Sequence, residues 1–105
     1  MGLISIAAFK AKPGKDAELI KVIDDRLPVL RRLGLSTDRA EIRCRSKDGV
    51  VITISEWTDQ AAIDRAHQTP EVLALWGRFA ACCEWLKLDS IDECREDFAT
   101  FEAMY

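Results

Sequence analysis

The first third of the chain contains a continuous apolar run, followed by a segment in which apolar residues recur at helical spacing. Residues 3–11 are apolar or small at almost every position, which is typical of a strand that is covered on both faces. Residues 16–33 then place apolar side chains at helical spacing on one face and predict a helix. Pro28 lies inside this run and removes a backbone donor, so we expect the helix to kink or to split there. Gly34 followed by Leu35 predicts the helix end, with the leucine closing over it.

The middle of the chain has the pattern of a β-hairpin. Residues 39–46 alternate between charged and apolar side chains, which predicts a strand with one polar face. We expect it to be an edge strand with a solvated charged face, because charges there discourage unwanted pairing. The Asp48-Gly49 pair is typical of a hairpin turn. Residues 50–57 are rich in β-branched side chains and predict a central second arm.

The last part of the chain predicts two helices, a strand and an apolar tail. Thr58 or Asp59 is a suitable cap for a short helix over about 59–67. The segment Thr69-Pro70-Glu71 combines a cap, a proline at the first helical position and an acid in the first turn, and it predicts a helix that runs to about Cys83. Residues 85–93 alternate again and predict a further strand, whereas residues 98–105 form an apolar tail.

This order of elements predicts the fold class. Strand, helix, two strands, a helix pair and a strand form the β-α-β-β-α-β plan of an α+β, ferredoxin-like domain, with helices on one face of an antiparallel sheet. One domain over residues 1–105 is the expectation for this length. A single helix layer covers one face only, yet the strands are apolar on both. We therefore expect a homodimer that packs sheet to sheet, with the tail crossing that interface.

Composition excludes several classes of function. The net charge of −3 and the interspersed charges disfavour binding to nucleic acid. No apolar run approaches the roughly 20 residues that span a bilayer, and no basic region precedes the first apolar stretch, so we expect neither membrane insertion nor a signal peptide. None of the four cysteines lies in a Cys-x-x-Cys pair and the chain has one histidine, so we expect no metal site. Reduced thiols in a cytoplasmic protein are the expectation.

Four short segments together resemble a known family. They are Lys12-Pro13-Gly14 after the first strand, Glu56-Trp57 at the end of the third, His67 with Pro70 before the long helix, and Phe98-Ala99 with Phe101-Glu102 at the end. In this combination the chain resembles the antibiotic biosynthesis monooxygenase-like family of dimeric α/β barrels, over nearly its whole length. The resemblance implies a pocket between helices and sheet in each subunit, and an oxygenase of small aromatic or quinol-type molecules that needs no cofactor.

Family members that degrade haem carry an asparagine, a tryptophan and a histidine at set places. This chain has Ser5, Ala66 or His67, and Trp76 there, so the resemblance does not imply haem degradation. Members that oxidise quinols often carry a histidine before the proline turn, as His67 is here. Many carry a second histidine after that proline, where this chain has Glu71.

His67 is the candidate catalytic base. It is the only side chain in the chain that normally titrates near neutral pH. A cofactor-free oxygenase needs a base to deprotonate a phenolic substrate, because the anion donates an electron to oxygen more readily than the phenol does. This role requires His67 to face a pocket beside Trp76 and to have a polar partner on its second nitrogen. The alternative is an exposed or capping histidine, which a helix end favours.

Aromatic and small polar side chains are the candidate substrate-binding residues. Trp57, Trp76 and Phe79, with Trp85, have the character of a mostly apolar pocket wall, and plain core packing is the alternative. Ser5 and Ser55, with Thr53, place hydroxyls on otherwise apolar strands, where they bond a ligand, one another or water. We expect Glu56 to pair with Arg43 or Arg45. Two functions remain open: a cofactor-independent monooxygenase-like enzyme, and a non-catalytic small-molecule-binding or structural protein of the same fold.

Overall fold

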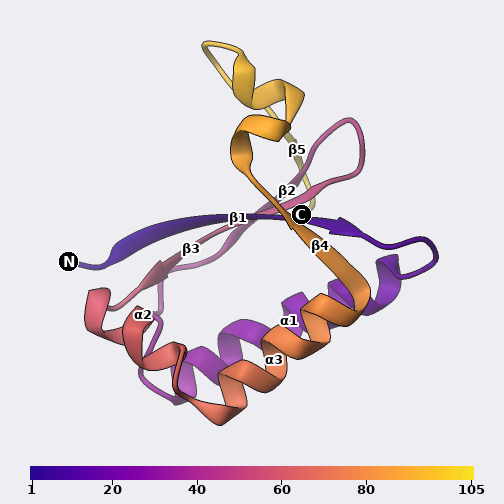
Figure 1. The fold of residues 1–105 in the computed structure, drawn as a ribbon. Coiled ribbons are helices and arrows are strands. Elements are labelled where there is room, and N and C mark those ends of the chain that lie inside the picture. The colour runs from indigo at the N-terminus through magenta and orange to yellow at the C-terminus, as the bar shows by residue number, and fades with distance from the viewer.

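An antiparallel sheet with three helices packed on one face forms the body of the molecule (Figure 1). The computed structural model describes residues 1–105. The strand order is β4-β1-β3-β2-β5, so the α+β, ferredoxin-like expectation is confirmed. The strands are β1 (Leu3–Ala11), β2 (Ile42–Arg45), β3 (Val51–Trp57), β4 (Cys83–Leu86) and β5 (Glu102–Ala103). The helices are α1 (Asp16–Arg32), α2 (Gln60–Ala66) and α3 (Pro70–Cys82), and two 3₁₀ turns follow β4 at Leu88–Ser90 and Asp92–Arg95.

The register of β1 and β3 decides which side chains face the helices. The two strands pair with Ser5 opposite Ser55 and Phe9 opposite Val51. Phe9 and Val51 belong to an apolar cluster that includes residues of α1 and α3. Because successive side chains of a strand point to opposite faces, Ser5 and Ser55 also face the helices. We call this side of the sheet the inner face and the opposite side the outer face.

Helix α1 continues unbroken through Pro28, so of the two expected outcomes, a kink or a split, the split is wrong. The proline lacks the N–H that would bond the carbonyl of Asp24, four residues earlier. Both residues are exposed, and this carbonyl therefore remains open to water. A missing bond on the solvent side of a helix is tolerated more easily than one inside the core.

The end of α1 follows the sequence expectation. Gly34 has a φ of +73°, a conformation that glycine adopts without steric cost. The N–H of Leu35 donates to the carbonyl of Leu30 at 2.8 Å, which closes the last turn. Leu35 is buried with Leu30 in one apolar cluster. The glycine thereby turns the chain back towards the sheet.

Strand β2 differs from its expected form in three ways. It spans only Ile42–Arg45, and β5 pairs with it on its free side, with Arg45 opposite Glu102. Arg43 lies opposite Thr53 of β3, on the inner face. The side chains of Glu41 and Arg43 are only 6% and 12% exposed, so the expectation of a solvated charged face is wrong at these two positions. Helix α1 covers them, which the alternation of charged and apolar residues did not reveal.

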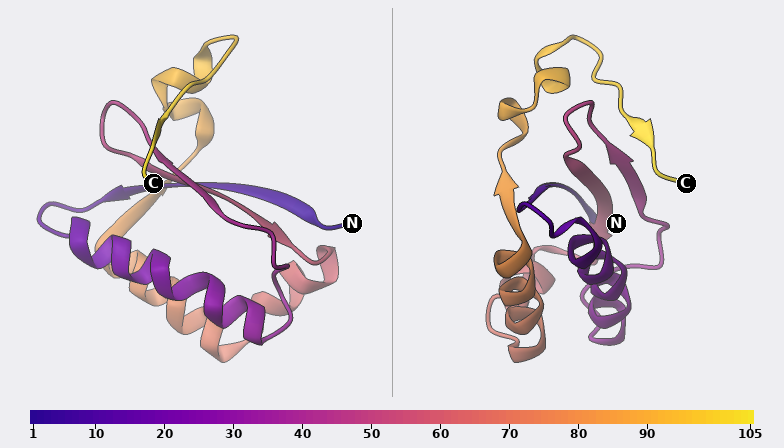
Figure 2. Two further views of the ribbon diagram at one scale, coloured as in Figure 1. Left: turned by 180° about the vertical axis from the view of Figure 1, so that it is seen from behind. Right: turned by 90° about the vertical axis from the view of Figure 1, so that its right-hand side faces the viewer.

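Strand β4 begins at Cys83 and ends at Leu86, so the expected strand over residues 85–93 is largely wrong. Leu86 is the last residue that pairs with β1, and the chain then leaves the sheet through the 3₁₀ turns. Ile91 is nevertheless buried, because it packs on the outer face against Ala8 and Ile52. Figure 2 shows this C-terminal segment rising from the side of the sheet opposite the helices and returning to β2.

The outer face is partly covered by the chain itself and partly open. The C-terminal segment buries one part, including Ala8 and Ile52. Ile4, Ile6 and Ile42 are 55%, 48% and 58% exposed, respectively. Isoleucines at such exposure on one sheet face form an apolar surface that favours burial. None of the helices has the length and the apolar run that crossing a membrane requires.

Candidate functional site

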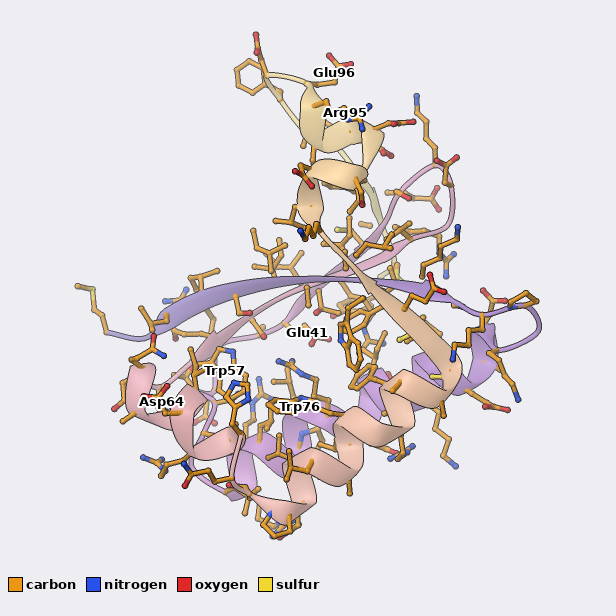
Figure 3. The ribbon with its side chains drawn as sticks, in the orientation of Figure 1. Glu41, Trp57, Asp64, Trp76, Arg95 and Glu96 are labelled. Carbon is orange, nitrogen blue, oxygen red and sulfur yellow. The ribbon has the colours of Figure 1, made fainter.

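The predicted site residues gather on the inner face and on the helices that cover it. Ser55 and Trp57 lie on β3, and Ser5 lies opposite Ser55 on β1. Trp76 and Phe79 come from α3, and His67 caps the C-terminal end of α2. Figure 3 shows Trp57 and Trp76 between the sheet and the helices. The fold thus brings together residues that are far apart in the sequence.

His67 lies beside Trp76, but it is exposed and caps the end of α2, which is the alternative that the sequence left open for it. The two ring centroids are 4.9 Å apart, with the planes inclined by 60°. No side-chain hydrogen bond to the imidazole is present, so the polar partner expected on its second nitrogen is not found. Neither His67 nor Trp76 lines any of the five main hollows of the structure. The single chain thus provides neither the pocket nor the polar partner that the base role requires, and His67 as a base stays a prediction without support from this geometry.

The two aromatic residues of α3 differ in their surroundings. Phe79 is 1% exposed, stacks on Phe9 with centroids 4.8 Å apart, and lies 6.0 Å from Trp85. Trp76 is only partly buried and packs against both apolar clusters beneath the sheet. Phe79 thus has the contacts of a core residue, whereas Trp76 borders both the core and the surface near His67.

A buried charged cluster lies on the same inner face. Arg26 of α1 is 9% exposed, and its Nη1 donates to the hydroxyl of Ser55 at 3.4 Å. The same Nη1 lies 4.0 Å from Oε2 of Glu41. The guanidinium carbon also lies 5.8 Å from the centroid of the Trp57 ring, within cation–π range. Arg26 therefore connects Glu41 with two of the predicted site residues.

Glu41 is held mainly by Arg43. Its Oε1 accepts from Nε and Nη2 of Arg43 at 3.2 and 2.9 Å, while its Oε2 is buried and has no hydrogen-bond partner. Nη1 of Arg43 donates to Asp24 at 2.7 Å. Burial lowers the pKa of Arg43, but the hydrogen bonds with Asp24 and Glu41 outweigh it and raise the pKa overall.

Burial has the opposite net effect on Arg26. Loss of hydration lowers the pKa of its guanidinium, and the negative charge of Glu41 offsets this only in part. An arginine remains protonated at neutral pH even so. The cluster thus places a positive charge in an apolar interior, next to a carboxylate that does not hydrogen-bond to it.

The sequence expectations did not include Arg26 or Glu41 among the site residues. A signal for Arg26 was present, because it occupies a position of the apolar stripe of α1, three residues after Ile23 and four before Leu30. A charged residue at such a position is buried by its neighbours and needs a partner. Glu41 carried no comparable signal, since the alternation of residues 39–46 fits either face of a sheet.

Glu56 lies apart from this cluster and has a different partner from the one expected. Its Oε1 accepts from the hydroxyl of Thr37 at 2.8 Å and lies 3.2 Å from Nε of Arg39. The expected pair with Arg43 or Arg45 is therefore wrong. The side chain of residue 56 points to the outer face, opposite the side on which Arg43 lies.

The edge of the sheet beside Glu41 is hollowed. A hollow of about 300 Å³ is lined by Glu41, Ile42, Arg43, Cys44, Phe101, Ala103 and Tyr105. The Tyr105 hydroxyl donates to the backbone carbonyl of Glu41 at 3.0 Å, and its ring lies 5.7 Å from the guanidinium carbon of Arg43. The C-terminal residue thus lies directly against the charged cluster. No group of three or more His, Cys, Asp or Glu side chains is arranged to hold a metal ion.

Comparisons with known proteins agree with this architecture. A family model described as antibiotic biosynthesis monooxygenase matches residues 2–76. Among solved structures, the chain is similar to the crystal structure of SnoaB, a cofactor-independent oxygenase from Streptomyces nogalater, with a TM-score of 0.66 and 21% sequence identity. That match covers 79% of this chain and 84% of the other. No curated protein matches the sequence.

Proposed function

Because the chain belongs to the antibiotic biosynthesis monooxygenase family, we propose that it is a cofactor-independent oxygenase of a small aromatic or quinol-type molecule. The family match favours this enzyme over a non-catalytic binding protein of the same fold. The fold of SnoaB supports the same architecture, while the substrate and the residues that act on it belong to the proposal.

The observation that carries the proposal is the family match over residues 2–76, and the contact between His67 and Trp76 makes His67 the candidate base within it. This contact places the one histidine of the chain against an aromatic residue that packs on both apolar clusters beneath the sheet. In the proposed reaction His67 accepts the proton of a phenolic hydroxyl, and the resulting anion gives one electron to oxygen, which leaves a substrate radical and superoxide. These two combine to a hydroperoxide, which takes back the proton from His67 and loses water to give the quinone. Trp57 and Trp76 contribute the apolar wall, Phe79 supports it from the core, and Ser5 and Ser55 contribute hydroxyls.

The test is oxygen uptake with a panel of substituted benzo- and naphthohydroquinones, corrected for uptake without protein. Wild-type protein should raise the rate, and His67→Ala should lower it by roughly 100-fold or more, as expected for loss of a general base. Gln68→Ala changes the exposed neighbour and serves as the control. Uptake that is unchanged in His67→Ala would remove His67 from the mechanism. Absence of uptake with every hydroquinone would contradict the oxygenase and favour the binding protein.

We also propose that the enzyme is a homodimer whose subunits meet through their outer faces. Ile4, Ile6 and Ile42 leave an apolar surface that the chain's own C-terminal segment does not cover. A second copy, related by a two-fold axis, would present the same side chains and bury both surfaces together. The substrate would then occupy the inner side of each subunit, away from the contact.

A further inference from the structure

Glu41 is the buried side chain that the fold leaves without a full set of hydrogen-bond partners. The side chain is 6% exposed, and Oε2 is the only buried side-chain nitrogen or oxygen without a hydrogen-bond partner. A buried acceptor without a partner destabilises the fold, and the cost is larger when the acceptor is charged. Since buried polar groups are nearly always paired, this oxygen points to a partner that does not come from the chain itself.

Arg26 adds an under-used donor at the same place. A guanidinium has five N–H groups, and the one hydrogen bond that Arg26 makes is the 3.4 Å contact with Ser55. The guanidinium lies over Trp57 and close to Oε2 of Glu41. An acceptor, a donor and an aromatic ring therefore lie next to one another on the inner face. This combination suits a ring-shaped molecule that carries oxygen substituents.

Glu41 also borders a hollow on the surface, although its Oε2 is itself buried. It contributes to the lining of the hollow at the β2–β5 edge, together with the aromatic residues Phe101 and Tyr105. The hollow measures about 300 Å³, which is at the lower end of the range of small-molecule sites. One residue thus belongs both to the buried cluster and to an opening on the surface.

We propose that Glu41 and Arg26 form a ligand-binding pair that the sequence pattern does not reveal. Oε2 of Glu41 accepts a hydrogen bond from a hydroxyl group of an aromatic ligand, and Arg26 donates to an oxygen of the same ligand. A carboxylate accepts from a hydroxyl and repels an anion, so the ligand class is a neutral hydroxylated aromatic molecule. This inference rests on the proposed function for the aromatic class and adds the residues that select the hydroxyl.

The experiment compares binding of 1-naphthol with binding of 1-methoxynaphthalene, which has the same rings but no donor. Equilibrium dialysis without oxygen keeps turnover out of the measurement. Wild-type protein should prefer the naphthol by roughly 10- to 100-fold, the range of a hydrogen bond to a charged group. Glu41→Leu should lose this preference. Glu71→Leu removes an exposed carboxylate from α3 and should keep it.

Equal affinity of wild-type protein for both probes, or a preference that survives in Glu41→Leu, would overturn the inference and leave Glu41 with a structural role only. Glu41→Gln retains the shape of the side chain and removes its charge, so it carries the test should the leucine variant fail to fold by circular dichroism. Its preference should fall by about tenfold, as a neutral acceptor is weaker than a charged one, and a full preference would overturn the inference as well.

The two proposals fail in different ways. A preference for naphthol in a protein that consumes no oxygen with any hydroquinone would sustain the ligand-binding pair and contradict the oxygenase. Oxygen uptake with an unchanged KM in Glu41→Gln, together with equal binding of both probes, would sustain the oxygenase and contradict the ligand-binding pair.

Discussion

Oε2 of Glu41 and Nη1 of Arg26 lie 4.0 Å apart beneath the sheet, and no hydrogen bond joins them. The contact links the first helix with the segment that leads into β2, which the sequence separates by 15 positions. It also places both charges beside Trp57 and Ser55, two residues that the sequence pattern had already indicated. The chemistry available on the inner face is therefore ionic as well as aromatic.

Removing the buried arginine should destabilise the protein far more than removing an exposed one. Arg26→Met leaves Glu41 buried with one cation fewer and should reduce the free energy of unfolding by about 3 kcal/mol. Arg32→Met breaks an exposed pair with Glu71 and should change it by less than about 1 kcal/mol. Urea unfolding followed by circular dichroism measures both. Equal changes in the free energy of unfolding would show that the buried Arg26 stabilises the protein no more than the exposed Arg32.

The outer face should control the oligomeric state. Sedimentation velocity of the wild-type protein should give about twice the chain mass of 11.8 kDa. Ile6→Glu places a charge on the exposed part of that face and should yield a folded monomer. Leu73→Glu makes the same change at a similarly exposed position on α3 and should remain dimeric. A monomeric wild-type protein would contradict the proposed dimer.

We expect Glu56 to stabilise the folded protein at neutral pH and to lose this contribution in acid. The hydrogen bond from Thr37, followed by that from Arg39, lowers the pKa of the Glu56 carboxyl below its ordinary value of 4.5. Since the folded-state pKa is the lower one, this contribution is complete above the unfolded-state pKa and is lost as pH falls through the folded-state pKa. Thr37→Val should therefore raise the pKa of Glu56 and weaken the acid dependence of Tm.

Carboxyl ¹³C titration by NMR measures the pKa of Glu56, and thermal scans between about pH 3 and 7 measure the Tm. Thr100→Val, at an exposed position far along the chain, is the matched control and should leave both unchanged. A Glu56 titration that is the same in Thr37→Val and in the wild type would show that Arg39 alone sets the pKa.

Cys83 should make the fold sensitive to alkali. Burial, with a smaller contribution from the neighbouring Cys82, raises the pKa of the Cys83 thiol from 9.0 to about 12. Between these values the unfolded chain loses the thiol proton while the folded chain retains it, so stability falls as pH rises. Cys83→Ala should reduce the fall in unfolding free energy between about pH 8 and 11. Cys94→Ala, at a half-buried thiol, should show the wild-type fall. An identical decline in both variants would rule out Cys83 as its source.

Short-range patterns determined most of the elements. The apolar run of residues 3–11, the helical spacing after residue 16, the Asp48-Gly49 turn and the Gly34 stop all correspond to the structure, because each is fixed by neighbours along the chain. The order of these elements then restricted the fold to the ferredoxin-like plan. The sequence also offered Ser5, Ser55, Trp57, Trp76 and Phe79 as candidate pocket residues. The fold places them on the inner face and on α3, and their role in binding stays a prediction.

What the sequence could not determine depends on contacts between distant segments. The alternation of residues 39–46 defines two faces of a strand but not which face helix α1 covers. Glu41 and Arg43 were therefore expected in solvent, although both side chains are largely buried. The alternation after Trp85 likewise does not reveal that Leu86 is the last residue paired with β1. Only tertiary packing decides which side of a strand loses its water, and here that decision created the charged cluster beside Trp57.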